Sequence, residues 1–76
     1  MVDVHSGVAV YSVWRSVHAL RLTTGQDVVL AARPRAIVAL QIEAPGVVYA
    51  FDTVKGIREV GNLAFVPFSR VSAALS

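Results

Sequence analysis

Arginine residues grouped around a proline are the feature of this sequence best suited to chemistry. Pro34 fixes its own backbone and restrains Arg33, so Arg33-Pro34-Arg35 carries two guanidinium groups on a stiff support. If the flanking segments pair as a hairpin, Arg15 comes close to Arg35, with Trp14 beside it. Guanidinium groups bind phosphates or carboxylates, and an aromatic ring can stack a base. The cluster predicts a site for a nucleic-acid backbone or an acidic protein surface. The alternative is a charged sheet edge that only deters unwanted pairing.

The residue types needed for catalysis or metal binding are present but not grouped. The sequence has no cysteine and two histidines, His5 and His18, which disfavours a zinc site. His18 lies in an apolar stretch without a visible orienting partner, which favours a structural role over that of a general base. The sequence contains no glycine-rich phosphate loop or nucleophile motif, and its five carboxylates are scattered. We expect a non-enzymatic protein without catalytic residues, metal or cofactor.

Apolar residues are more abundant than a chain of this length can easily bury. They make up 55% of the 76 residues, and charged residues make up 16%, against about 45–50% and about 25% in typical domains. So short a chain buries roughly 60–65% of its surface on folding, and it has no disulfide to add stability. We therefore expect association with copies of itself or with another protein. The alternative is that the fifteen valines and eleven alanines each expose little area.

Valine-rich segments separated by turn signals favour β-strands. The turn signals are Thr23-Thr24-Gly25-Gln26-Asp27, Ala44-Pro45-Gly46 and Gly61-Asn62. Around the second turn, the expected register pairs Ile42 with Tyr49 and Leu40 with Phe51 on one buried face. The opposite face mixes polar side chains with a half-covered apolar set: Ile37, Ala39, Val48 and Ala50. This second face is predicted to be covered by another sheet layer or another subunit.

The two ends of the chain are less clearly patterned. Residues 8–14 and 16–22 alternate as strands with a bend near Arg15-Ser16, although several of them also fall at helical spacing. Residues 68–75 are predicted to form a short closing strand; the alternative is one or two helical turns capped by Ser69. The expected fold is a single all-β domain over residues 1–76. It is a small barrel or rolled antiparallel sheet of five or six short strands, with room for one short helix.

The C-terminal run Leu63-Ala64-Phe65-Val66-Pro67-Phe68-Ser69-Arg70-Val71 is similar to the endings of small β proteins encoded by bacteriophages. The resemblance covers nine residues. It implies a phage-encoded protein, such as a virion component, and assigns no site.

We expect a structural or interaction protein that acts through protein–protein contacts, as a homo-oligomer or a repeated component of an assembly. The predicted interaction residues are Trp14, Arg15, Arg33, Arg35, Ile37 and Val48. The alternatives are a small nucleic-acid-binding β-barrel that uses the arginine cluster, for which a net charge of +2 is low, and a small inhibitor that docks on a host enzyme. No secretion signal or membrane-spanning segment is recognisable, so a cytoplasmic or particle-bound location is expected.

Overall fold

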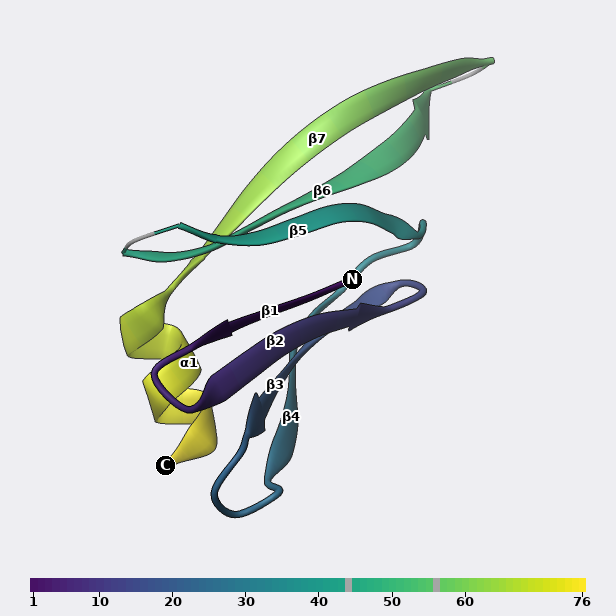
Figure 1. Cartoon of the computed structure of the whole chain (residues 1–76). Coiled ribbons are helices and arrows are strands. Elements are labelled where there is room, and N and C mark those ends of the chain that lie inside the picture. Colours follow the sequence, from purple (N-terminus) through teal and green to yellow (C-terminus); the bar gives the residue numbers. More distant parts are fainter. Residues whose placement is uncertain (44, 56) are drawn as a thin grey trace.

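The computed structural model describes residues 1–43, 45–55 and 57–76. Within these ranges, seven strands form two antiparallel sheets and one helix follows them (Figure 1). The first sheet contains β1 (Val2–His5), β2 (Val8–Val13), β3 (Ser16–Arg21) and β4 (Asp27–Ala32), and the second contains β5 (Ile37–Glu43), β6 (Gly46–Lys55) and β7 (Arg58–Pro67). The helix α1 spans Phe68–Leu75. The expected strands over residues 8–14 and 16–22, with a bend between them, are confirmed as β2 and β3.

The core lies between the two sheets and is closed at one end by α1 (Figure 1). Its buried side chains are mostly valine and other apolar residues that alternate along the strands with exposed ones. They are Val10, Val17, Ala19, Leu30, Ile37, Val47, Tyr49, Phe51, Val66, Val71 and Leu75. Both sheets and the helix contribute, so the described residues form one core.

The prediction of a mostly antiparallel β fold is confirmed, and the short helix that it allowed for is present. The expected five or six strands are too few, because the described residues form seven. These strands make two separate sheets, so the expected closed barrel is not confirmed. The predicted closing strand over residues 68–75 is wrong, and the alternative of a short helix is correct. Val71 and Leu75, four residues apart, are 4% and 3% exposed and anchor the helix on the core. Pro67 rather than Ser69 occupies the N-cap position, because its fixed φ suits the point where a strand turns into a helix.

The hairpin of β5 and β6 has the predicted buried face in a different register. Leu40 pairs with Tyr49 and Ile42 with Val47, two residues away from the expected partners. A shift of two leaves every side chain on its original face, so the face assignment survives. Ile37 is the exception. A bulge between Ile37 and Ala39 turns Ile37 into the core, where it is 6% exposed, so its predicted place on the outer face is wrong.

The predicted hairpin turn at Gly61-Asn62 is also wrong, because both residues lie inside β7. The chain reverses between Lys55 and Arg58, which pair with each other. The Asn62 side-chain amide donates to Thr53 Oγ1 (3.0 Å) and to the Val60 carbonyl oxygen (2.9 Å). Asn62 therefore serves to hold β6 and β7 together.

The molecule is elongated. Its radius of gyration is 12.7 Å and its extents are 44 × 21 × 19 Å, whereas a compact chain of this length has a radius of gyration of about 11.4 Å. The last pair between β5 and β6 joins Ile37 to Phe51. Beyond that pair, β6 pairs with β7 on one side only, and the β6–β7 hairpin extends away from the rest of the molecule (Figure 1).

Candidate functional site

One long edge of β7 is open. Phe68 N donates to the Pro45 carbonyl oxygen (2.9 Å), and Lys55 pairs with Arg58. In an antiparallel ladder, residues whose backbone groups bond to the partner strand alternate with residues whose backbone groups point away from it. Because Phe68 bonds to Pro45, the even-numbered residues of β7 direct their backbone groups towards β6, and the odd-numbered residues direct them away. The backbone N–H and C=O groups of Gly61, Leu63 and Phe65 accordingly point outward, with no backbone partner in the described chain. We refer to these three residues as the β7 edge.

The side chains of the β7 edge continue into an apolar sheet surface. The face of the second sheet that points away from the core carries two rows of cross-strand neighbours. These rows are Ala39–Ala50–Leu63 and Gln41–Val48–Phe65. Leu63 is 78% exposed and Phe65 is 48% exposed. Both side chains are therefore open to solvent. We call this surface the outer face; it is uncommon for a monomer to leave so apolar a sheet face uncovered.

The structure places the predicted residues Val48, Ala39 and Ala50 on the outer face. The sequence-based reasoning missed Leu63 and Phe65, because the assumed turn at Gly61-Asn62 ended the strand too early. Alternation of Leu63 and Phe65 with the inward-facing Ala64 and Val66 was the signal that could have revealed them.

Trp14 and Arg15 form an exposed corner at the turn between β2 and β3. Trp14 is 70% exposed and adopts a positive φ of 50°. Its carbonyl oxygen accepts a hydrogen bond from Ile37 N (2.6 Å), which fixes the turn against the start of β5. The Arg15 guanidinium carbon lies 4.3 Å from the centre of the Trp14 ring. An exposed tryptophan with a stacked arginine is a frequent binding element.

The predicted convergence of arginines differs from the arrangement found. Arg33 N donates to the Arg15 carbonyl oxygen (2.8 Å), so Arg33 rather than Arg35 lies opposite Arg15. The Arg33 side chain turns inward: Nε donates to the Tyr49 hydroxyl (2.9 Å), and the guanidinium carbon lies 4.6 Å from the centre of the Phe51 ring. Arg33 thereby supports the core, and Arg15 and Arg35 are the exposed members of the cluster.

A polar network crosses β2, β3 and β4 on the outward side of the first sheet. Ser16 Oγ lies 2.9 Å from His18 Nε2, and His18 Nδ1 lies 3.1 Å from Asp27 Oδ1. The Tyr11 hydroxyl donates to Asp27 Oδ2, and the Tyr11 ring stacks on His18 at 4.9 Å. The sequence-based reasoning missed this network because Asp27 is nine residues from His18 and reaches it only across a strand pair.

The order serine, histidine, aspartate matches that of a nucleophilic triad. The surroundings differ from those of a triad, however. Ser16 Oγ donates to the Val13 carbonyl oxygen (3.1 Å), and the group lies on an open sheet surface. An acyl-transfer site also needs paired N–H donors beside the nucleophile and a cavity for the substrate. We interpret the network as a polar clamp that joins three strands.

This clamp predicts a dependence of stability on pH at both extremes. The Tyr11 hydrogen bond, reinforced by His18 and opposed by partial desolvation, lowers the pKa of Asp27 from its ordinary value of 3.8. The stabilisation it provides is present above 3.8 and is lost as the pH falls through the lower, folded-state pKa. The same hydrogen bond raises the pKa of Tyr11 above 10.0, so that contribution is lost as the pH rises through the raised value. Urea midpoints measured across both ranges should show smaller changes in Asp27→Asn than in the unmodified chain; equal changes would contradict the assignment.

Asp3 joins the two sheets at the edge where β1 approaches β5. Asp3 Oδ1 accepts from Val4 N and Asp3 Oδ2 accepts from Ile42 N, each at 2.9 Å. The carboxylate therefore occupies the place that backbone pairing would take if the two sheets were continuous. At this edge, β1 and β5 are therefore joined through a side chain and belong to separate sheets.

We expect Asp3→Asn to destabilise the fold by about 1–3 kcal/mol, because the side-chain NH₂ group must then face a backbone N–H donor. The free energy of unfolding in urea measures the effect. Glu43→Gln removes the same charge from the neighbouring β5 and serves as the control, with an expected change of about 0.5 kcal/mol or less. Equal losses in the two variants would show that Asp3 acts through net charge alone.

In the part of the chain that the structure covers, no group of three His, Asp or Glu side chains is arranged to hold a metal ion. No helix in residues 1–43, 45–55 and 57–76 has the length and apolar character needed to cross a bilayer. The chain matches no protein-family model, and no curated protein or solved structure is significantly similar to it.

Proposed function

We propose that this chain is a non-enzymatic interaction protein that acts through protein–protein contacts, and that a second copy of the chain pairs with it along the β7 edge. The observation that carries the proposal is the coincidence of unpaired strand backbone with the exposed Leu63 and Phe65 side chains. Natural edge strands are usually protected by charge, proline or a bulge. From Val60 to Val66 this strand has no charged residue and no proline.

Antiparallel pairing of two β7 edges around a two-fold axis is self-complementary. With Leu63 opposite Leu63 of the second copy, Gly61 faces Phe65 of the second copy. An aromatic ring placed over a strand glycine covers backbone that the glycine leaves bare. Pro67, which has no N–H to donate, falls at an outward position near the end of the paired segment, where the loss is smallest. The result is a continuous six-stranded sheet with a broad apolar outer face.

A closed two-fold pair uses both β7 edges and leaves the outer face and the Trp14–Arg15 corner available. This arrangement supports a repeated component of a larger assembly, in which pairs of chains contact further proteins through those surfaces. A virion is one such assembly.

The native mass tests the proposal. Light scattering at two concentrations should show a species of about twice 8.1 kDa whose fraction rises with concentration. Leu63→Ala removes only the side chain, whereas Leu63→Pro also removes the outward N–H while leaving the β6–β7 bonds in place. We expect Leu63→Pro to dissociate the pair at concentrations where Leu63→Ala remains partly associated. A monomeric unmodified chain, or identical masses for the two variants, would overturn the edge-pairing model.

A second pair of variants locates the surface. Val29 is 58% exposed on the outward side of the first sheet and offers a matched control for Leu63. Leu63→Lys should shift the population to monomer, and Val29→Lys should leave the mass unchanged. The opposite result would place the contact on the first sheet instead.

Nucleic-acid binding is the second candidate, favoured by the exposed Trp14 ring with Arg15 stacked on it. Such a site would retain single-stranded oligonucleotide at low salt and release it as the salt rises, and Trp14→Ala would weaken it. The inward turn of Arg33 removes one of the cations expected at the site, so protein contact is the better-supported function.

A further inference from the structure

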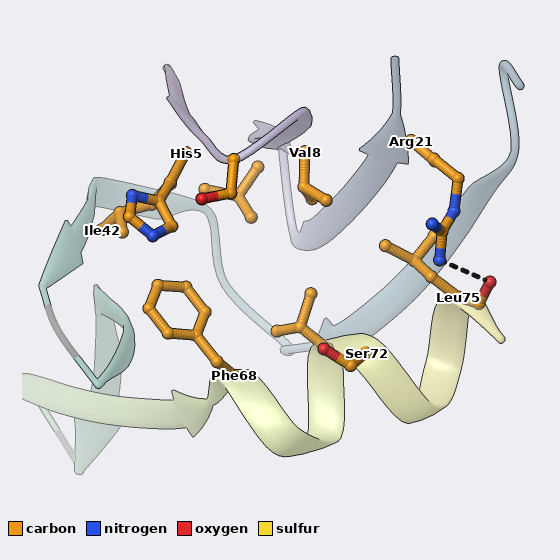
Figure 2. Close-up of a pocket in the computed structure, with 10 residues that line it drawn as sticks. His5, Val8, Arg21, Ile42, Phe68, Ser72 and Leu75 are labelled. Carbon is orange, nitrogen blue, oxygen red and sulfur yellow. Dashed lines mark hydrogen bonds between the residues drawn. The ribbon is translucent and has the colours of Figure 1, made fainter. Parts of the chain in front are cut away.

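A cavity of about 330 Å³ lies between the first sheet, the end of β5 and α1 (Figure 2). Its walls are mainly apolar: Val8 and Val10 come from β2, Ile42 from β5, and Phe68, Val71 and Leu75 from α1. At about 30 Å³ per water molecule in the liquid, this volume corresponds to an organic molecule of on the order of ten non-hydrogen atoms.

The two ends of the cavity differ in polarity. Figure 2 shows Arg21 at one end and His5 with Phe68 at the other. The His5 and Phe68 rings are stacked, with centroids 5.1 Å apart and planes inclined by 9°. The rings together form an apolar end wall, and Ser6 and Ser72 also line the cavity.

Arg21 brings a positive charge to an otherwise apolar space. One of its terminal nitrogens donates to the Leu75 carbonyl oxygen (3.1 Å), at the C-terminal end of α1. Guanidinium has five N–H donors, and this bond uses one of them. The carbonyl groups at the end of a helix attract a cation but carry only partial negative charge. Across the residues that the structure describes, no carboxylate lies within ion-pair distance of Arg21. Half-buried and facing the cavity, this cation suits an anionic group.

We infer that the cavity binds a small amphipathic carboxylate, with the carboxylate on Arg21 and an unbranched apolar chain between β2 and α1. Most ligand sites are apolar pockets with a few polar groups that fix orientation, and this cavity has that composition. The site is independent of the proposed self-association, because the β7 edge and the outer face contribute nothing to it.

The test uses the full chain and three probes of equal chain length: octanoate, octanol and octylamine, each kept below the concentration at which it forms micelles or separates from solution. Backbone amide NMR shifts should change saturably at residues of α1 and of the β1–β2 turn when octanoate is added. Octanoate should bind at least tenfold more tightly than octanol, and octylamine should bind more weakly than octanol. Arg21→Gln should abolish the preference for octanoate, Arg21→Lys should keep most of it, and Arg58→Gln, on the projecting hairpin, should change nothing.

A second variant separates binding from folding. Ser72 is exposed at the cavity wall, so Ser72→Phe fills the space while keeping Arg21. This variant should lose binding of both octanoate and octanol with unchanged circular dichroism. Absence of saturable shifts, or equal affinities for octanoate and octanol in the unmodified chain, would overturn the inference. Neither result bears on the native mass, so the two proposals fail separately.

Discussion

Replacing Tyr49 by alanine should destabilise the protein by about 3–5 kcal/mol, the cost typical of removing a large buried aromatic side chain. Tyr49 is 2% exposed and is the largest of the fully buried side chains. A domain of this size is stabilised by only about 4–11 kcal/mol. Tyr49→Ala should therefore be largely unfolded at temperatures where the unmodified chain is folded, as circular dichroism and urea titration at one fixed protein concentration would show.

Tyr49→Phe separates packing from hydrogen bonding at the same position. It keeps the ring and removes the oxygen that accepts from Arg33 Nε at 2.9 Å. We expect a loss of about 1–2 kcal/mol, reduced by the partial exposure of Arg33, which lets water replace the lost partner. If Tyr49→Phe cost as much as Tyr49→Ala, the hydrogen bond rather than the ring would hold β6 to the arginine segment.

Gly46→Ala should be the second most damaging substitution, with a loss of about 3 kcal/mol. A Cβ atom at Gly46 would overlap the Val66 carbonyl oxygen and lie 2.6 Å from Phe65 Cζ. The backbone contact cannot be relieved by rotating a side chain, so β6 and β7 would have to separate where they begin to pair. The thermal midpoint should fall sharply, and amide exchange should accelerate first at this end of the hairpin.

Gly61→Ala is the matched control, because it adds the same methyl group to the same hairpin. There the nearest atom to a new Cβ is Asp52 Oδ1 at 3.9 Å, an ordinary van der Waals distance. We expect a change within about 1 kcal/mol, in the stabilising direction because alanine restricts the unfolded chain. If the two variants lost stability equally, the close approach at Gly46 would not be what requires glycine.

The sequence alone shows which side chains of a strand face the core, because inward-facing and outward-facing residues alternate. It correctly placed Leu40, Ile42, Tyr49 and Phe51 on the core side of the second sheet. The side-chain period of two is a local property of an extended chain, so it survives an error of two residues in register. For the same reason Val48 was placed correctly, whereas Ile37, beyond a bulge, was not.

Long-range contacts decided the rest. Residues 68–75 form a helix because this places Val71 and Leu75 on the core. Gly61 and Asn62 do not form a turn, because the chain already reverses after Lys55 and both residues pair with β6. The direction of the Arg33 side chain depends on Tyr49, sixteen residues away, and the edge between the sheets depends on a bond from Ile42 to Asp3, thirty-nine residues away. Local composition sets which residues avoid water, but it carries no information about which distant partner satisfies a given charge or backbone group. Only the packed chain brings those partners together.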